Sequence, residues 1–404
     1  MSSKLFLSIL SLFLLVSFPI ISSVGASSMM WSQTYGGMTG KLAQSLVETS
    51  DGGYAIAGDD LLVKTDANGN MEWNQTFQDG SGAVNSLVET SDGGYAIAGS
   101  DQFIKTDAQG NIEWTKTFQN RLVSSLVETS DGGYAIAGYT IAFLYYEPFI
   151  YPDFWLAKTD SYGNKEWTQT YGGTDGDYAH SLVETSDGGY ALAGWTGSFG
   201  AGKGDFWLVK TDSYGNMEWN QTYGGEAIDR AYSLIETSDG GYALAGWTGS
   251  FGAGKTDFWL VKTDIQGNME WNQTYGEETI ERAHSFIETS DGGYALAGDI
   301  GSSDMESLDV LLVKTDTHGN MEWNQTYGGT NADYAYSLVQ TSDGGYALAG
   351  GTSSFGPGDA NFWLIKTDAQ GIPEFPSWTP LLIMLVAVAV LGVNYRRKLN
   401  TPKS

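Results

Sequence analysis

Two residue types that carry much enzyme chemistry, cysteine and histidine, are scarce in this chain of 404 residues. It has no cysteine and only three histidines, which excludes disulfides, thiolate metal sites and cysteine nucleophiles. His180 and His284 each precede a serine, where related segments carry Tyr232 and Tyr336. An exchange of histidine with tyrosine indicates packing. We find no nucleophile–base–acid set, and we predict no catalytic residue, no metal site and no cofactor.

A recurring acid precedes one predicted strand in four related segments. A ring of such acids near a common axis could bind a cation or act in hydrolysis. Loop-ordering hydrogen bonds explain the same residues, and two of the acids have Arg230 or Arg282 beside them, which weakens the metal hypothesis. The four acids are Asp177, Asp229, Glu281 and Asp333.

Two short motifs match ligand-binding patterns and are rejected. Residues 249–256 fit the phosphate-binding loop pattern, but that chemistry needs a following helix, and residues 257–262 have the pattern of a strand. Residues 66–72 resemble a calcium loop, but later units lose the ligand spacing. We therefore predict no nucleotide binding.

The charge of the chain excludes other partners. The formal net charge is −28, and residues 27–373 hold 15 Lys and Arg against 47 Asp and Glu. Phosphates need a basic surface, so we predict no nucleic-acid partner and no docking on anionic lipid. Hydrophobic residues at 41% are sufficient for a folded core.

Three motifs, each repeated seven times, must position any functional residue. Ser-Asp-Gly-Gly-Tyr occurs with its Asp at 51, 92, 131, 187, 239, 291 and 343. Lys-Thr-Asp and Trp-x-x-Thr-[Tyr/Phe] recur in register with it. Each unit contains four short apolar runs separated by turn signals, and none has a helical pattern.

The turn residues predict antiparallel hairpins. Asp-Gly in the first motif predicts a two-residue turn with positive φ angles. Ala67-Asn68-Gly69 predicts a three-residue loop closed by a left-handed glycine. That register would place Lys64 directly opposite Glu72, a pair that recurs in the first six units.

Four antiparallel strands in about 40–50 residues are typical of a β-propeller blade. The Trp motif comes first, at Trp31, and the last unit ends at Gly371 without its own Trp strand. We therefore predict an all-β, seven-bladed β-propeller over residues 27–371, in which residues 31–37 complete blade 7. A linear solenoid would need no such permutation.

The strings TSDGGYALAGWTGSFGAGKTDFWLVKTD and GNMEWNQTYGG resemble the DGGY-repeat propellers of secreted archaeal and bacterial proteins. The resemblance covers residues 31–371. It implies a propeller fold and an extracellular setting. It implies no shared catalytic residue.

The two ends of the chain have the patterns of targeting segments. Residues 1–26 predict a secretory signal peptide, with an uncleaved anchor as the alternative. Residues 378–395 are uncharged and just long enough to span a bilayer, and residues 396–404 form a basic tail expected in the cytoplasm. We therefore predict an exported protein held at the cell surface.

Between the propeller and this apolar segment lies a linker, residues 372–377, that contains Pro373, Glu374 and Phe375. Together with the apolar segment and basic tail, it resembles C-terminal sorting signals of archaeal surface proteins. The resemblance implies a sorting protease or transpeptidase and a lipid attached in place of the helix. Otherwise, the helix remains as an anchor.

We name the strands of each blade a to d, from the axis outward. The b–c and d–a loops share one face and vary in length, so we predict the ligand face there. Trp195 and Trp247 could stack on sugar rings there or pack between blades. A cluster in the b–c loop of blade 3 could form a partner surface or a lid; it comprises Tyr139, Phe143, Tyr145, Tyr146, Phe149 and Tyr151.

Four Asn-Gln-Thr sequons lie on predicted outer strands and are candidate glycosylation sites: Asn74, Asn220, Asn272 and Asn324. The function predicted is a non-enzymatic, surface-anchored module that binds envelope protein or glycan, or serves as envelope architecture. The alternative is an extracellular polysaccharide hydrolase or lyase that uses acids at the channel mouth.

Overall fold

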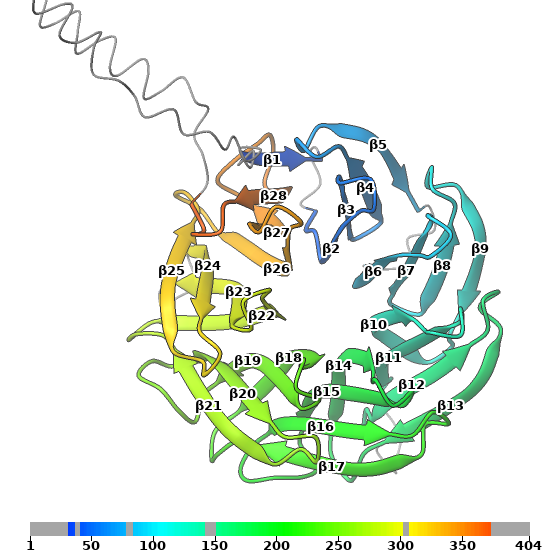
Figure 1. Ribbon diagram of the computed structural model, residues 1–404, viewed down its shortest axis with the longest axis vertical. Coiled ribbons are helices and arrows are strands. Elements are labelled where there is room, and N and C mark those ends of the chain that lie inside the picture. The colour runs from blue at the N-terminus through cyan, green and yellow to red at the C-terminus, as the bar shows by residue number, and fades with distance from the viewer. Residues whose placement is uncertain (1–30, 37–40, 78–83, 142–150, 302–306, 373–404) are drawn as a thin grey trace, which may run out of the picture.

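The computed structural model describes residues 31–36, 41–77, 84–141, 151–301 and 307–372. These residues form seven four-stranded antiparallel sheets arranged in a ring (Figure 1). The prediction of an all-β, seven-bladed propeller is confirmed. Within the described ranges no helix is long and apolar enough to cross a membrane. The predicted signal peptide, the sorting motif at 373–375, the apolar segment at 378–395 and the basic tail lie outside them.

Each blade contributes its four strands in order from the axis outward. Blade 1 comprises β2 (Ser45–Glu48), β3 (Tyr54–Gly58), β4 (Leu61–Thr65) and β5 (Met71–Thr76). Blade 2 comprises β6 (Ser86–Glu89), β7 (Tyr95–Gly99), β8 (Gln102–Thr106) and β9 (Ile112–Thr117). Blade 3 comprises β10 (Arg121–Glu128), β11 (Tyr134–Thr140), β12 (Phe154–Thr159) and β13 (Lys165–Tyr171). Blade 4 comprises β14 (Asp177–Glu184), β15 (Tyr190–Thr196), β16 (Asp205–Thr211) and β17 (Met217–Tyr223).

The remaining blades follow the same plan, and the last one borrows a strand. Blade 5 comprises β18 (Asp229–Glu236), β19 (Tyr242–Thr248), β20 (Asp257–Thr263) and β21 (Met269–Tyr275). Blade 6 comprises β22 (Ile280–Glu288), β23 (Tyr294–Gly301), β24 (Leu308–Thr315) and β25 (Met321–Tyr327). Blade 7 comprises β26 (Asp333–Gln340), β27 (Tyr346–Thr352), β28 (Asn361–Thr367) and β1 (Trp31–Tyr35). The pairing of β1 with β28 joins the two ends of the propeller.

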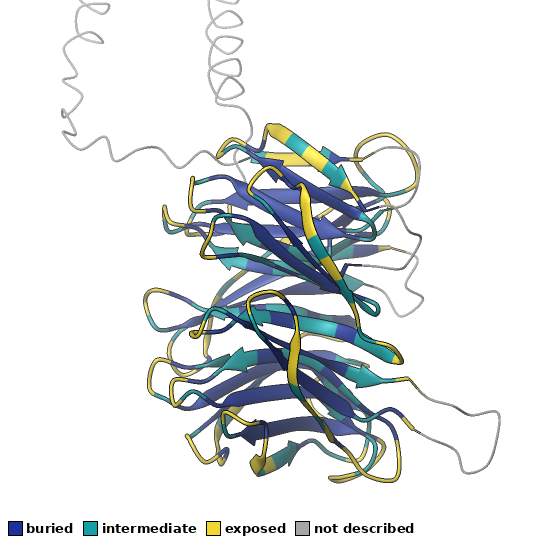
Figure 2. Ribbon diagram, turned by 90° about the vertical axis from the view of Figure 1, so that its right-hand side faces the viewer, coloured by how far each residue is buried: buried dark blue, intermediate teal, exposed yellow. Residues whose placement is uncertain are grey.

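The burial of each strand follows its place in the blade. Strands b and c are buried along almost their whole length, whereas the outer strands alternate between exposed and half-buried residues (Figure 2). The core therefore lies between the flat faces of neighbouring blades. This explains why the b and c strands read as continuous apolar runs.

The a–b turns differ from the predicted two-residue hairpin. In blade 1 the loop has three residues, 50–52, because Thr49 N donates to Gly53 O (2.9 Å) and Gly52 N donates to Thr49 O (2.8 Å). Only Gly52 has a positive φ, of 84°. The carboxylate of Asp51 accepts hydrogen bonds from Thr49 Oγ1 (2.6 Å) and Gly53 N (3.0 Å). These bonds hold Asp51 inside the loop, so the prediction of a two-residue turn was wrong.

The predicted register of the c–d hairpin is wrong by one residue. Lys64 lies opposite Trp73, and a register shift between Lys64 and Thr65 places Glu72 at a bulge. The left-handed glycine of the loop is present at Gly69, with φ of 75°. Despite the bulge, Lys64 Nζ lies 3.0 Å from Glu72 Oε2, so the predicted ion pair forms.

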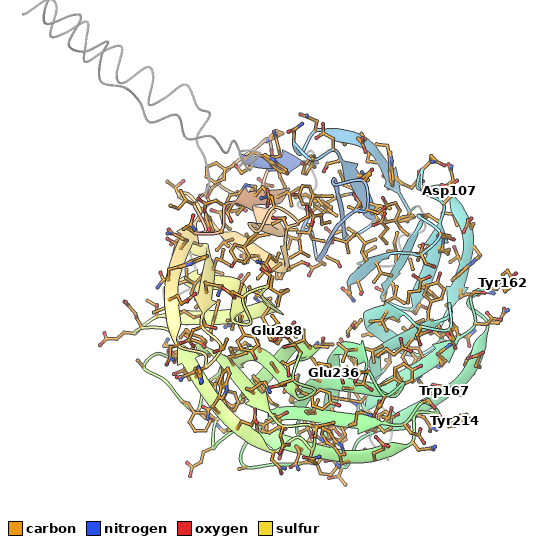
Figure 3. The ribbon with its side chains drawn as sticks, in the orientation of Figure 1. Asp107, Tyr162, Trp167, Tyr214, Glu236 and Glu288 are labelled. Carbon is orange, nitrogen blue, oxygen red and sulfur yellow. The ribbon has the colours of Figure 1, made fainter. Side chains whose placement is uncertain are left out.

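The repeated motif residues join neighbouring blades. The backbone N–H of Leu46 donates to Ser337 Oγ (3.1 Å), which links blade 1 to blade 7, and equivalent bonds link the other six pairs of blades. On the a–b turn face, Ser186 N donates to Glu236 (2.7 Å) and Ser238 N donates to Glu288 (2.9 Å). Figure 3 shows both glutamates on the inner ring, and Tyr162 and Tyr214 on the outer rim. The residues that recur in every blade therefore have a structural role.

Candidate functional site

One pair of positions near the axis differs from blade to blade. One position is the second residue of strand a in blades 3, 4, 5 and 7 and the third in blade 6. The other is the residue opposite it on strand b, on the side of the b–c and d–a loops. In blades 3 to 7 the facing pairs are Leu122 with Tyr139, Tyr178 with Trp195, Arg230 with Trp247, Arg282 with Asp299, and Tyr334 with Gly351. This variation distinguishes the b–c/d–a mouth of the propeller from its opposite face.

Six of these side chains form a continuous stack across blades 3 to 6. The ring centroids of Tyr178 and Trp195 lie 4.6 Å apart at an interplanar angle of 15°. Arg230 Cζ lies 4.6 Å from the Trp195 ring and 5.6 Å from the Trp247 ring. We name this stack the aromatic–arginine ladder; its members are Tyr139, Tyr178, Trp195, Arg230, Trp247 and Arg282.

The ladder shows where the two predicted tryptophans lie. Trp195 contacts Tyr178 of its own blade and Arg230 of the next, so it packs between blades. Trp247 contacts Arg230 of its own blade and Arg282 of the next. All three of Trp195, Trp247 and Arg230 are half-buried. The rings are therefore engaged within the protein, on the side of the blades that carries the b–c and d–a loops.

Arg230 is a charge without a carboxylate partner. No ion pair forms between Arg230 and any acid in the described part of the chain, and its Nε atom is buried without a hydrogen-bond partner. The contacts with the two indole rings hold the guanidinium in place, each worth about 0.5–2 kcal/mol. An unpaired cation in a chain of net charge −28 is unexpected. From the sequence alone, Arg230 was only a reason to doubt a metal site.

A second arc of side chains projects from the innermost strands. His180, Tyr232, His284 and Tyr336 stand at the bulge of strand a in blades 4 to 7, with successive ring centroids 4.8, 5.4 and 5.1 Å apart. The pKa of His180 is lowered to about 4, chiefly by burial and to a smaller extent by repulsion from Arg230 and His284. The histidines pack with the tyrosines, as their exchange in the sequence predicted.

The four predicted channel acids are fully buried. Each of Asp177, Asp229, Glu281 and Asp333 is 0% exposed. Asp177 accepts hydrogen bonds from Ser198 Oγ (2.8 Å), Gly173 N (2.9 Å) and Thr196 Oγ1. These bonds order the b–c and d–a loops, so the acids do not face the mouth as the hydrolase hypothesis requires.

Each of these acids has a second carboxylate beside it, from strand c of the preceding blade. The backbone of Gly224 separates one such pair, since a Cβ added there would lie 1.8 Å from Asp205 Oδ1 and 2.8 Å from Asp229 Oδ2. The pKa of Asp205 is raised to about 6, chiefly by burial and to a smaller extent by the nearby Asp229 carboxylate. The four partners are Asp153, Asp205, Asp257 and Asp309. Their recurrence at the start of strand c, before Phe-Trp-Leu in blades 3 to 5 and before Val310 in blade 6, is a signal in the sequence that pointed to these pairs.

The described residues contain no group of three or more His, Asp or Glu side chains arranged to hold a metal ion. Of the blade 3 aromatic cluster, Tyr139 is half-buried in the ladder and Tyr151 is exposed. The other four members, Phe143, Tyr145, Tyr146 and Phe149, lie outside the described ranges. Asn74, Asn220, Asn272 and Asn324 are exposed on outer strands, so their glycosylation is sterically possible and stays a prediction.

A comparison of sequences finds a distant relative of this chain. No family model matches the chain. A regulatory protein of Caulobacter vibrioides, FlaEY, is 25% identical over 216 residues, which cover 48% of this chain and 23% of that protein. The chain thus spans less than a quarter of the curated relative's length.

Two solved structures share the architecture at low identity. The Pan2 WD40 domain of Neurospora crassa superposes with a TM-score of 0.52 at 10% identity, covering 83% of this chain and 99% of that one. The extracellular domain of a B. thetaiotaomicron protein described as a hybrid two-component system gives a TM-score of 0.51 at 12% identity, covering 86% of this chain and 44% of that one. At these identities the likeness shows the propeller fold alone.

Proposed function

We propose that this propeller is an exported binding module, held at the cell surface, that engages an envelope glycan or protein through the b–c/d–a mouth. The observation that carries the proposal is the unpaired guanidinium of Arg230 between Trp195 and Trp247. A guanidinium offers several N–H donors in a fixed plane and suits carboxylate or other anionic groups. The two indoles hold it in position before a ligand arrives, which reduces the entropy lost on binding.

The opposite face offers less for a ligand. There the turns are nearly identical in all blades, and their polar groups already bond to one another, as Glu48 does with Ser342 Oγ (2.8 Å). A surface whose polar groups are already paired within the protein has fewer donors and acceptors for a partner. The mouth combines variable loops, half-buried aromatic rings and an unpaired cation, which is the usual composition of a binding site.

The two targeting segments support an extracellular setting for this site. The signal peptide would export the propeller. The apolar segment at 378–395, or a lipid that replaces it after cleavage at the sorting motif, would hold it at the membrane. The buried position of the four acids gives no support to the hydrolase alternative.

Photo-crosslinking in the native envelope tests the proposal. A photoreactive residue would replace Phe251, which is 44% exposed in a b–c loop, and a matched control would replace Tyr214, which is 69% exposed in a c–d turn. We expect an adduct from position 251 and none from position 214. Arg230→Gln should reduce the adduct while the protein remains folded, with a loss of stability of about 1–4 kcal/mol from its two ring contacts. A crosslink from position 214 alone would reject the mouth as the binding site. So would a crosslink from position 251 whose yield does not change in Arg230→Gln.

A further inference from the structure

A pocket of about 520 Å³ lies at the outer edge of the ring, between blades 2 and 3. Its walls come from β9, the loop that follows it, and β10, β12 and β13. Three cations line it, Lys116, Arg121 and Lys165, together with Phe118, Trp155 and Asn164. None of the residues that line the pocket is acidic, although the chain carries 48 Asp and Glu against 20 Lys and Arg.

The three cations are departures from the repeat. Lys116 stands where the other six units carry Gln, as at Gln75 and Gln169. Lys165 stands where the other units carry Met or Ile, as at Met217. Arg121 stands in β10 where blades 4 to 7 carry the buried acid that begins strand a, as at Asp177. Three independent replacements thus bring positive charge to one junction.

These cations are not neutralised by neighbouring acids. Within the described ranges none of the three forms an ion pair. Lys116 Nζ donates to Asn164 Oδ1 (2.9 Å), and Arg121 Nη1 donates to the carbonyl of Asn120 (2.8 Å). The acid that Lys116 influences is Asp160; its pKa is lowered chiefly by the hydrogen bond from Asn164 and to a smaller extent by Lys116. Asp160 already accepts bonds from its own turn, so the pocket retains its positive charge.

A change in one aromatic residue accompanies the opening of the pocket. At the next junction Tyr171 is buried, and its hydroxyl donates to Gly215 O (2.6 Å). At this junction Phe118 has no hydroxyl for Gly163 O; it is half-buried and contacts Trp155, with ring centroids 5.0 Å apart. Blade 1 also has a phenylalanine here, Phe77, but it stays buried and no cluster of cations accompanies it.

We propose that this pocket is a second ligand site, which binds an acidic saccharide unit. The three cations would pair with a carboxylate or sulfate. Asn164 and the other polar side chains of the wall can hydrogen-bond to hydroxyl groups, and the face of Phe118 can contact a sugar ring. The volume lies within the usual range for small-ligand sites, about 300–1,000 Å³. This site is separate from the mouth and does not depend on the function proposed for it.

Isothermal titration of the full chain in detergent with trigalacturonate tests the proposal, with a neutral cello-oligosaccharide, inorganic sulfate and inorganic phosphate as separate probes. We expect trigalacturonate to bind and its affinity to fall as salt rises, because salt screens charges at a partly exposed site. The double variant Lys116→Gln, Lys165→Met should weaken binding about tenfold or more. Both replacements are residues that related units carry at the same positions, so the fold should tolerate them.

Two further variants keep the outcome interpretable. Phe118→Tyr should weaken binding because its hydroxyl can reach Gly163 and close the pocket, as Tyr171 does at the next junction, while stability stays equal or rises. Tyr214→Ser changes an exposed c–d turn residue outside both the pocket and the mouth and should leave binding unchanged. Absence of trigalacturonate binding, or equal binding by the double variant, would overturn the proposal. Sulfate or phosphate binding as tightly as trigalacturonate would overturn the saccharide assignment. In either case the crosslinking result at position 251 would be unaffected.

Discussion

The ammonium nitrogen of Lys64 lies 2.8 Å from Oδ2 of Asp51, which ties the c strand of blade 1 to its a–b turn. Lys64 is only 4% exposed, and its other partners are Glu72 Oε2 (3.0 Å) and Thr65 O (2.9 Å). The same arrangement recurs in blades 1 to 6. In blade 7, Asp343 is the one acid of the described ranges that pairs with Lys366, and the sequence has Met30 where the other units have Glu.

Each such triad of one lysine and two acids, as in Lys64 with Asp51 and Glu72, predicts how the stability of the fold changes at low pH. Burial opposes ionisation, but hydrogen bonds from Lys64 and Thr49 lower the pKa of Asp51 from 3.8 to about 2. A carboxylate whose pKa is lower in the folded state stabilises the fold above its unfolded value and loses that contribution as pH falls. We therefore expect stability to decline between about pH 4 and pH 2, measured by denaturant unfolding at each pH. An unchanged unfolding midpoint across this range would contradict the prediction.

Within one triad, the two acids should differ in importance. Asp51→Asn should cost about 1–3 kcal/mol, because it weakens the bonds to the buried ammonium and to the turn together. Glu72→Gln should cost less stability, about 0.5 kcal/mol, because the side chain is partly exposed and blade 7 folds without a glutamate at this position. Urea unfolding of both variants gives the comparison. A larger loss from Glu72→Gln would reverse this ranking.

The buried carboxylate pair between blades 4 and 5 predicts opposite effects for its two members. Asp205→Asn should stabilise the protein above about pH 6, because burial and Asp229 raise the pKa of Asp205 to about 6 and its charged form is disfavoured in the folded state. We expect a gain of about 1–3 kcal/mol at pH 8 that disappears below pH 4. Blade 7 carries Asn361 at this position, which indicates that an amide fits.

Asp229→Asn is the matched control for that gain. Asp229 accepts hydrogen bonds from Gly225 N (2.9 Å), Ser250 Oγ (2.8 Å) and Thr248 Oγ1. An asparagine amide has only one acceptor oxygen, and its other terminal atom is a donor. It cannot accept all three hydrogen bonds, so the variant should lose about 1–3 kcal/mol of stability. Thermal unfolding of both variants at pH 4 and pH 8 measures the difference. Stabilisation by Asp229→Asn, or destabilisation by Asp205→Asn at pH 8, would refute the assignment.

The closing strand β1 should be held by its contacts with blade 1. Tyr35 Oη donates to Gly69 O (2.6 Å), and a Cβ added to Gly69 would lie 2.4 Å from the Trp31 ring. Tyr35→Phe should therefore cost about 1 kcal/mol. Gly69→Ala should cost more, because its positive φ and the tryptophan both oppose a side chain. Limited proteolysis should release the N-terminal segment faster in both variants, whereas Gly36→Ala, where no atom lies within 4 Å, should show less change apart from its own positive φ.

The repeat made the fold predictable, because each motif residue recurs seven times and its role is the same in every blade. The pattern of apolar runs and the early position of Trp31 were sufficient for the blade number and the closing strand. The two wrong predictions, the length of the a–b turn and the register of the c–d hairpin, concern places where local side-chain interactions affect the backbone conformation. The carboxylate of Asp51 lengthens the a–b turn, and a bulge beside Lys64 moves Glu72 out of register. Neither effect has a signature in hydrophobic periodicity.

The candidate site was less predictable, because its contacts join blades. Trp195 and Arg230 are 35 positions apart in the chain, and their stacking depends on the rotation between adjacent sheets. The pocket beside Lys116 likewise combines residues of two units. Comparing equivalent positions across units could have identified it, since Lys116, Arg121 and Lys165 are each exceptions at their positions. The carboxylate pairs could have been identified in the same way.

The aromatic–arginine ladder predicts a measurable coupling between Arg230 and Trp195. In a double-mutant cycle with Arg230→Met and Trp195→Leu, we expect a coupling energy of about 0.5–2 kcal/mol, because the guanidinium is partly desolvated against the ring. Arg230→Lys should retain the charge but lose part of the coupling, since an ammonium cannot stack as a planar guanidinium does. The matched control is Lys116 with Trp114, a cation 5.8 Å from its ring at the outer rim, whose coupling should lie at the low end of the range. Urea unfolding without ligand supplies all four free energies. Equal coupling in the two pairs would mean that Arg230 is not held in advance, and the preorganisation on which the proposed binding site depends would be lost.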